Sequence, residues 1–380
     1  MREVVILEGA RTPFGRAVKG NLRQTRVEDL GALAVRGAIE RAGIEPGAVE
    51  DLALGCAMPE GSQGLNVARI IGFLSGLPHT SPAYTVNRFC ASGLQTIASV
   101  AARIAVGEMD VAVAGGVESM TAVPMGGFHP QLHPKLAIEY PEAYIAMGTT
   151  AENVAARFKV EREAQDAFAF ASHRKATIAR EKGLLGAEIL AVDTTVDGQA
   201  VRVEHDELIR PDTTLEGLAK LRPAFDPKGT VTAGNSSPLT DGAAAVVVST
   251  REAAGGREVL GTFKRFVTVG VEPDIMGIGP VPAIRKLLAA TGLGIGDIDL
   301  FEINEAFAAQ SVYCQRELGV PDEKLNVNGG AIALGHPLGV SGTRLALTAL
   351  YELRRRGGRR AVVSMCIGGG MGAAALLERG

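Results

Sequence analysis

The stretch from Thr85 to Gly116, TVNRFCASGLQTIASVAARIAVGEMDVAVAGG, places a cysteine where an extended segment gives way to a helix. Residues 82–86 have an extended pattern, whereas residues 94–106 are rich in alanine and have helical periodicity. Cys90 is therefore predicted to lie near a helix N-terminus, where unpaired N–H groups and the helix dipole favour a thiolate. The alternative is that Cys90 is only a small buried apolar residue.

Length and composition narrow the class of protein. The chain has 380 residues, which is enough for two or three domains. It is 46% apolar with a net charge of −3, which indicates a soluble globular protein without an electrostatic basis for binding nucleic acid. The arginine-rich segment 353–360 is interpreted as a solvated helix end.

Targeting and redox signals are weak in this sequence. We expect no apolar run long enough to span a bilayer, and segment 1–16 carries charges within its apolar stretch, unlike a signal peptide. The four cysteines contain no C-x-x-C pair and are too few for a disulfide framework. These features predict no membrane partner and a reducing, cytoplasmic location.

The two ends of the chain resemble each other. Residues 41–55, RAGIEPGAVEDLALG, match residues 290–304, ATGLGIGDIDLFEIN, and residues 86–95, VNRFCASGLQ, match the longer loop VNGGAIALGHPLGVSGTR at residues 327–344. Each match is followed by a helical segment and by a buried strand that ends in glycine. This pattern predicts a duplicated α/β domain.

The composition changes between the two copies. Charged, strongly helical and then β-like segments suggest an insertion at residues 119–238, and such insertions commonly carry substrate-binding surface. Residues 243–250, AAAVVVST, are predicted to form a strand that returns to the sheet of the first copy. The predicted domains are thus 1–118 with 239–260, the inserted loop domain, and 261–380.

Packing of the two copies as a pseudo-twofold pair would bring their matching strand-to-helix turns together. Cys90 would then lie beside His336, and a thiol next to an imidazole is an activated nucleophile for acyl groups. Cys366 precedes IGGGMG, a backbone that can approach a ligand closely and donate N–H groups to an oxyanion. Asn304 ends the matching strand, where its amide could orient water or His336.

These motifs resemble those of the thiolase family of acetyl-CoA acyltransferases. The resemblance covers essentially the whole chain and includes NRFCASGLQ, NEAFA, GGAIALGHPLGVSGTR and CIGGGMG in the family's order, with MGTTAENVA, KLRPAF and GTVTAGNSSPLTDGAAA between them. It implies a thiolase-like α/β fold in five layers, in which duplicated domains form two mixed sheets sandwiched with helices. Coenzyme A thioesters are then substrates, and no cofactor or metal is expected.

The resemblance implies a role for each reactive residue. Cys90 would become acylated while His336 accepts its proton, and Cys366 would act as acid and base on the α-carbon of acetyl-CoA. Asn304 would position a water that forms one oxyanion hole together with His336. The backbone N–H groups of Cys90 and Gly368 would form the other.

The resemblance also implies substrate contacts and an assembly. The partners would be acetyl-CoA, 3-ketoacyl-CoA and coenzyme A, and the protein would form a homodimer or homotetramer through the sheet of the first copy. Arg210 would lie near the adenine end of coenzyme A. The remaining contacts would be Leu221, Ala233, Ser237 and Met276 for coenzyme A, with Met147 and Phe307 lining the acyl and pantetheine tunnel.

Two departures from the acetoacetyl-specific pattern bear on the substrate. Ala146 replaces the histidine that usually precedes Met-Gly, and Ser237-Pro238 replaces Ser-Gly. Together with PEGSQGLNVARI at residues 59–70, they favour the degradative branch, which accepts longer 3-ketoacyl chains. A short-chain acetoacetyl-CoA thiolase of biosynthesis is the alternative.

Other functions and sites are less consistent with the sequence. A ketosynthase would have histidine in place of Cys366, and a non-catalytic acyl-CoA-binding relative would not need the full set of reactive residues. Cys56 is interpreted as a residue that packs in the core or lines the dimer region, and Cys314 as a packing residue. The pair His129 and His133 lacks further metal ligands nearby, and the glycine-rich GGGMG lacks the lysine of a P-loop.

Overall fold

The structure is a computed structural model that describes residues 1–380. Its strands are β1 (Val4–Arg11), β2 (Gly15–Arg16), β3 (Leu52–Gly55), β4 (Ala83–Val86), β5 (Val111–Ser119), β6 (Val192–Val196), β7 (Gln199–Val203), β8 (Thr240–Thr250), β9 (Gly261–Gly270), β10 (Leu300–Ile303), β11 (Arg360–Ile367) and β12 (Met371–Arg379). Its α-helices are α1 (Val27–Ala42), α2 (Val67–Leu74), α3 (Ser92–Val106), α4 (Pro134–Glu139), α5 (Met147–Phe158), α6 (Arg162–Glu181), α7 (Leu215–Ala219), α8 (Pro280–Thr291), α9 (Ala308–Leu318), α10 (Ala331–Leu334) and α11 (Ser341–Arg356). The short 3₁₀ helices are η1 (Pro46–Ala48), η2 (Gly61–Gln63), η3 (Phe89–Ala91), η4 (Pro141–Tyr144), η5 (Pro273–Ile278) and η6 (Ile295–Asp297).

The strand topology repeats between the two halves of the chain. In the first half β3 pairs in parallel with β5, and β8 and then β1 follow in antiparallel orientation. In the second half β10 pairs in parallel with β11, and β12 and then β9 follow in antiparallel orientation. The predicted duplication is therefore confirmed, and β4 is an additional parallel strand at the edge of the first half.

The two halves meet at their equivalent strands. β1 and β9 are antiparallel and pair at Val5 with Thr262 and at Ile6 with Gly261. Hydrogen bonds thus join the two predicted sheets into one continuous ten-stranded sheet. The segment at residues 243–250 forms most of β8, which lies between β1 and β5 as the sequence predicts.

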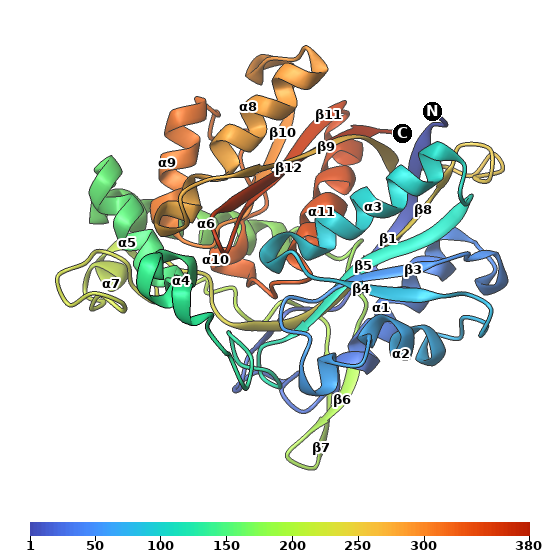
Figure 1. Ribbon diagram of the computed structural model, residues 1–380, viewed down its shortest axis with the longest axis horizontal. Helices are drawn as coiled ribbons and strands as arrows, with labels where there is room; N and C mark the ends of the chain where they lie inside the picture. Colours follow the sequence, from blue (N-terminus) through green and yellow to red (C-terminus); the bar gives the residue numbers. More distant parts are fainter.

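The helices and the two halves of the sheet alternate in five layers (Figure 1). α3 and α11 lie in the middle layer. One continuous core contains their apolar side chains together with residues from both halves of the sheet. α1 and α2 cover the outer face of the first half, and α8 and α9 cover the outer face of the second. A middle layer that is buried on both sides favours helices that are apolar nearly all round, as the alanine-rich α3 is. α11 is also buried along most of its length, but it carries the buried polar side chains of Arg344, Thr348 and Glu352.

Glycines allow the two middle helices to approach each other closely. A Cβ at Gly93, in the first turn of α3, would lie 2.5 Å from Thr343 Oγ1 and 2.7 Å from the carbonyl oxygen of Gly339. A Cβ at Gly342, in α11, would lie 2.4 Å from the backbone nitrogen of Leu94. The Ser-Gly pair present in each copy therefore brings the N-termini of α3 and α11 together, and with them the loops that precede these helices.

One sequence expectation about membranes is wrong. Segment Phe89–Val106 is long and apolar enough to span a bilayer by length and composition. It comprises η3 and α3, and 61% of it is buried inside the protein. Its apolar composition is explained by its place in the middle layer, between the two halves of the sheet.

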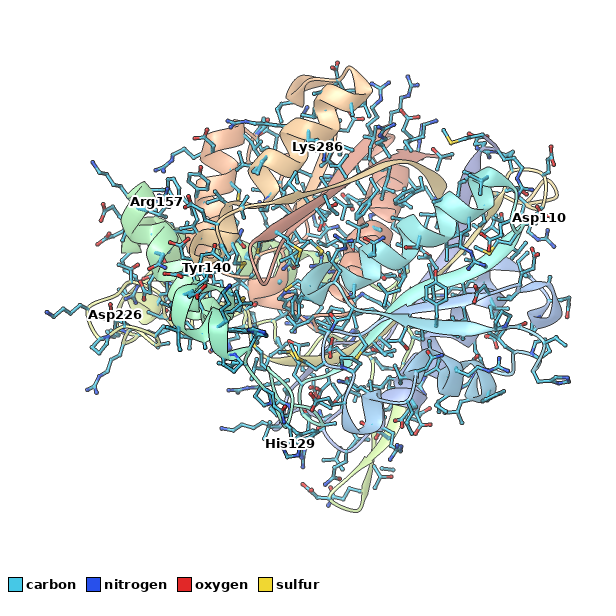
Figure 2. The ribbon with its side chains drawn as sticks, viewed as in Figure 1. Asp110, His129, Tyr140, Arg157, Asp226 and Lys286 are labelled. Atoms are coloured by element: carbon cyan, nitrogen blue, oxygen red, sulfur yellow. The ribbon has the colours of Figure 1, made fainter.

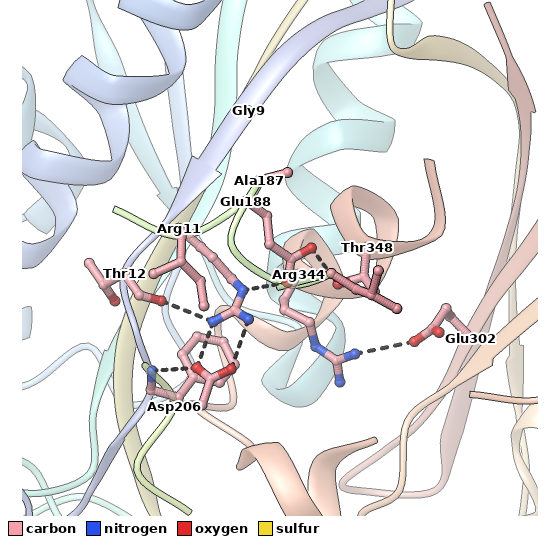
Figure 3. Close-up of polar contacts among 12 residues, drawn as sticks. Gly9, Arg11, Thr12, Ala187, Glu188, Asp206, Glu302, Arg344 and Thr348 are labelled. Atoms are coloured by element: carbon pink, nitrogen blue, oxygen red, sulfur yellow. Dashed lines mark hydrogen bonds and ion pairs between the residues drawn. The ribbon is translucent and has the colours of Figure 1, made fainter. Parts of the chain in front are cut away.

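The segment between β5 and β8 carries α4 to α7 and the β6–β7 hairpin, as its helical and β-like patterns predict. A buried ion-pair network ties this segment to β1 (Figure 3). Arg11 on β1 donates to Glu188 over 2.7 Å and to both oxygens of Asp206 over 2.7 and 2.9 Å. The hydroxyl of Thr348 on α11 also donates to Glu188, over 2.8 Å. The exact domain limits remain a prediction.

Candidate active site

Cys90 lies in a tight turn between β4 and α3. It belongs to η3, and the preceding Phe89 has a φ of 43°, a left-handed conformation that is unfavourable for a bulky side chain. The hydroxyl of Ser92 holds this turn, because it accepts from the backbone N–H of Arg88 over 2.8 Å and donates to the carbonyl of Phe89 over 2.7 Å. The predicted position of Cys90 at the start of a helix is thus confirmed.

A cavity of about 610 Å³ opens beside this turn, and both Cys90 and His336 line it. The chain therefore brings together two residues that are far apart in sequence. Six of the seven residues predicted to contact coenzyme A or line its tunnel also line the cavity: Arg210, Ala233, Ser237, Met147, Met276 and Phe307. Leu221 is not part of the lining and is 38% exposed.

Apolar residues that were not predicted from the sequence form much of the rest of the wall: Met120, Met125, Phe225, Pro238, Leu239 and Leu338. Leu239 and Phe225 are also exposed to solvent, so the cavity has an apolar mouth. Such a wall suits a thin ligand with few polar groups. His129 and His133 lie elsewhere, on an exposed surface loop (Figure 2 labels His129).

The protonation state of Cys90 differs from the expectation. Burial raises the pKa of the thiol to about 11, although the N–H groups of Gly368 and of Cys90 itself lower the pKa toward the thiolate. These hydrogen bonds favour the thiolate, but their effect on the pKa is smaller than the cost of desolvation. Cys90 is a neutral thiol at physiological pH and needs a base to ionise it.

His336 has the geometry of such a base. Its Nδ1 lies 2.6 Å from Ser341 Oγ, and the Ser341 hydroxyl donates its only hydrogen to the carbonyl of Pro337 over 2.9 Å. Nδ1 must therefore carry the proton, which leaves the lone pair on Nε2. Burial and the nearby Arg344 lower the pKa of His336 to about 3, so the imidazole is neutral.

Asn304 follows β10 and faces the same imidazole. Its Nδ2 lies 3.2 Å from Nε2 of His336, which agrees with a lone pair on Nε2. The residue is fully buried, and its Oδ1 has no hydrogen-bond partner within the protein. A donor is therefore needed beside Asn304, and a water molecule in this position would supply it.

Cys366 lies near the end of β11 and is fully buried. The backbone N–H of Gly368, two residues further along the chain, donates to the Cys90 sulfur, and Cys90 acts electrostatically on the thiol of Cys366. Burial is the largest cause that raises the pKa of Cys366 well above its usual value, and Cys90 and Cys314 add to it. The structure therefore places the two cysteines that are predicted to react in one site, as the matching turns of the two copies predict.

A buried carboxylate joins the loop after β3 to the loop that carries His336. Glu118, near the end of β5, accepts from the backbone N–H groups of Ala57, Met58 and Gly339 over 2.8, 3.2 and 2.7 Å. Because Gly339 belongs to the second copy, these hydrogen bonds cross between the copies. They fix the His336 loop against the loop after β3. The carbonyl of Ala57 in that loop accepts from the side chain of Asn87, just before the turn of Cys90, over 3.0 Å.

Sequence reasoning missed several of these residues. Ser341 could have been found, since it follows His336 by five residues at the start of a helix, where side chains commonly bond within their own loop. Glu118 resembles an ordinary residue at the end of a strand, and only the fold shows its partners. Cys56 and Cys314 are buried, which confirms their interpretation as packing residues, and all four cysteines are unpaired.

Comparisons with known proteins agree with this geometry. Two family models match, "Thiolase, N-terminal domain" at residues 4–252 and "Thiolase, C-terminal domain" at residues 257–379. The chain is 52% identical to the 3-ketoacyl-CoA thiolase of Bacillus subtilis over an alignment of 389 positions, with both chains fully covered. It is 49% identical to 3-ketoacyl-CoA thiolase B, peroxisomal, of Mus musculus, over 99% of this chain and 91% of that one.

Solved structures give the same result. Acetyl-CoA acetyltransferase of Bacillus anthracis and human mitochondrial 3-ketoacyl-CoA thiolase each superpose with a TM-score of 0.93 at 38% identity, over 100% of this chain and 99% of theirs. With both family models in chain order and relatives near half identity over the full length, the chain belongs to the thiolase family.

Proposed function

We propose that the protein is an acetyl-CoA acyltransferase that cleaves 3-ketoacyl-CoA with coenzyme A and catalyses the reverse Claisen condensation. The observation that carries the proposal is the single site in which Cys90 and His336 line one cavity while Cys366 lies next to it. One thiol can carry the acyl group, and the second thiol can move the proton of the α-carbon.

In the cleavage direction, the Cys90 thiol gives its proton to Nε2 of His336, and the sulfur attacks the 3-keto carbon. The bond between C2 and C3 then breaks, and the departing acetyl-CoA carbanion takes the proton of Cys366. Coenzyme A next attacks the thioester on Cys90 after giving its thiol proton to Cys366. The released Cys90 thiolate recovers its proton from His336, so both thiols and the imidazole return to their starting states.

Two groups of donors would stabilise the developing oxyanions. The N–H groups of Cys90 and Gly368 converge on the Cys90 sulfur, where the thioester oxygen would be placed during attack. Asn304 and His336 form the second group, with a water that satisfies the buried Oδ1 of Asn304. Neither hole requires a metal, and we expect no cofactor besides the coenzyme A substrates.

The substrate class follows from the cavity wall. Ala146 and Pro238, the two departures from the acetoacetyl-specific pattern, both line the cavity. A small side chain at position 146 leaves room, and the apolar mouth would accept an aliphatic chain. We therefore favour 3-ketoacyl-CoA of more than four acyl carbons as substrate, with Arg210 near the adenine end of coenzyme A.

We also propose that the protein forms a homodimer or homotetramer in the cytoplasm. β4 is the edge strand of the first half, so its outer hydrogen-bonding groups are available for pairing. Next to it, α2 exposes the apolar side chains of Ile70, Phe73 and Leu74 at helical spacing. A second copy placed against β4 would cover both features.

The proposed division of labour can be tested by replacing each thiol. Cys90→Ser should abolish both the exchange of labelled coenzyme A into acetyl-CoA and the condensation, because an alcohol ionises far less readily than a thiol. Cys366→Ala should keep residual exchange but lose condensation by about 10²–10⁴-fold, since the α-proton has lost its base. Radiolabel exchange and condensation rates measure the two half-reactions separately.

Cys56→Ser is the matched control, because Cys56 is a buried cysteine outside the cavity and a serine hydroxyl keeps the hydrogen bond that its thiol donates to Glu118. Both activities should persist in this variant. If the Cys366 variant stayed folded and lost exchange and condensation equally, or if the Cys90 variant kept normal exchange, the assignment of nucleophile and base would be wrong.

A further inference from the structure

The side chain of Gln310, in the first turn of α9, lies against the sulfur of Cys366. Its Oε1 is 3.6 Å from Sγ, a hydrogen-bond distance for sulfur. Both residues are fully buried. The cavity lining includes neither Gln310 nor Cys366, so their contact lies behind the cavity wall.

Hydrogen bonds fix which end of the Gln310 amide faces the sulfur. The backbone N–H of Ala306 donates to Oε1 over 3.2 Å, and Nε2 donates to Ser311 Oγ over 3.1 Å. The Ser311 hydroxyl uses its hydrogen on the carbonyl of Phe307, over 3.0 Å, so its oxygen must accept from Nε2. The amide therefore presents an acceptor to Cys366, and the sulfur can only donate to it.

Packing holds Gln310 in this position. A Cβ at Gly277, in η5, would lie 2.6 Å from Cβ of Gln310, so the backbone of η5 passes directly over the glutamine. On the neighbouring turn of α9, the Cys314 thiol donates to the carbonyl of Gly277 over 3.4 Å. These contacts and its full burial oppose rotation of the glutamine away from the sulfur.

We propose that Gln310 is a positioning residue for the second thiol of the site, whose side-chain oxygen holds the S–H of Cys366 until the proton passes to the substrate carbanion. This inference rests on the proposed function, in which Cys366 is the acid and base. It adds that the protonated state and the direction of the S–H bond are set by an uncharged amide on α9.

The titratable groups around Cys366 act on its pKa in the same direction as the Gln310 amide. The titratable groups that act on it are Cys90 from η3 and Cys314 from α9, and both disfavour its thiolate. A hydrogen bond to the neutral form acts in the same direction and raises the pKa further. Loss of the acceptor should therefore lower the pKa of Cys366, and a carboxylate in its place should raise it.

Two variants with opposite expected shifts test the proposal. Gln310→Met keeps the length of the side chain but removes the acceptor, and Gln310→Glu keeps the acceptor and adds a negative charge at the alkaline pH where Cys366 titrates. The measurement is kcat/KM for thiolysis of acetoacetyl-CoA against pH, together with the exchange of labelled coenzyme A into acetyl-CoA.

At alkaline pH, kcat/KM for thiolysis falls where Cys366 loses its proton, and we call this part of the profile the alkaline limb. In Gln310→Met, we expect the alkaline limb to move down by about half to one pH unit. Thiolysis should fall by about three- to tenfold, whereas exchange should change less. In Gln310→Glu the alkaline limb should move to higher pH. The control Gln165→Met replaces another fully buried glutamine, on α6, whose amide donates to Val160 and Thr230, and it should leave both limbs in place.

A structural role alone would give both Gln310 variants the same sign of shift or none, and either result would overturn the proposal. A failure of the proposed function gives a different result: Cys366→Ala would then lose exchange and thiolysis equally, whatever the Gln310 variants do. If Cys366→Ala splits the two activities while the Gln310 variants leave the alkaline limb unmoved, only the role of Gln310 is refuted.

Discussion

Cys90 and His336 are both neutral at physiological pH, because burial acts against charge on each of them. The pKa of Cys90 is raised to about 11 and that of His336 is lowered to about 3, so the pair does not exist as a preformed thiolate and imidazolium. Ionisation must therefore accompany the attack on the substrate. The hydrogen bonds from Gly368 and from the backbone of Cys90 then stabilise the sulfur and the oxyanion together.

This neutral pair predicts the pH dependence of alkylation. The rate at which iodoacetamide modifies Cys90 should rise by about tenfold per pH unit from pH ~6 to ~9, because only the small thiolate fraction reacts below a raised pKa. Mass spectrometry of the Cys90 peptide measures the rate, and Cys90→Ser corrects for modification of the other cysteines. A plateau near neutral pH would instead indicate a stable thiolate–imidazolium pair.

At the scale of elements, the site depends on how closely two loops approach each other. A Cβ at Gly339, in the His336 loop, would lie 2.8 Å from the Cα of Cys56 and 2.8 Å from the carbonyl oxygen of Gly55. These are backbone atoms of the first copy, which cannot move without moving β3. The glycine thus sets the distance between the loops of the two copies.

Gly339→Ala should therefore displace His336 relative to Cys90. We expect a loss of about 1–3 kcal/mol in the free energy of unfolding from overpacking, and a fall in thiolysis of about 10²-fold from misplacement. Urea denaturation and initial rates measure the two effects. Gly296→Ala is the control, because Gly296 is exposed and has open space around it; equal effects in both variants would contradict this account.

At the scale of the whole molecule, the network around Arg11 holds the inserted segment onto the duplicated core (Figure 3). Arg11→Met would leave the carboxylates of Glu188 and Asp206 buried without their cation. We expect a loss of about 3–5 kcal/mol in the free energy of unfolding, measured by urea denaturation. Arg202→Met, which breaks an exposed pair with Asp193, should cost about 0–1 kcal/mol. Similar losses in both variants would show that burial of the Arg11 network is unimportant.

The proposed assembly is also a property of the whole molecule. Phe73→Glu on α2 should weaken a dimer that forms across β4, because it places a charge in the apolar patch beside the edge strand. Sedimentation velocity should show a dimer or tetramer for the unmodified protein and a smaller species for the variant. Ile178→Glu, at an exposed apolar position on α6, is the control, and a monomeric unmodified protein would refute the assembly.

The sequence by itself determined the duplication, the return of residues 243–250 to the first half of the sheet, and the candidate reactive residues. The matching segments at residues 41–55 and 290–304 indicated equivalent strands, and the glycine-ended strands indicated where loops would lie. These features are local, since periodicity, turn residues and motif spacing depend on neighbouring residues in the chain. The sequence therefore predicts correctly that Cys90 lies next to the start of α3.

Only the tertiary structure decided how these residues behave. The sequence indicated a thiolate at Cys90, whereas burial keeps the thiol neutral. The apolar composition of residues 89–106 is explained by the two halves of the sheet that flank this segment. Glu118, Ser341 and Gln310 act through atoms that other elements bring to them. Desolvation and hydrogen-bond geometry depend on every element packed around a group, and residue order along the chain does not specify them.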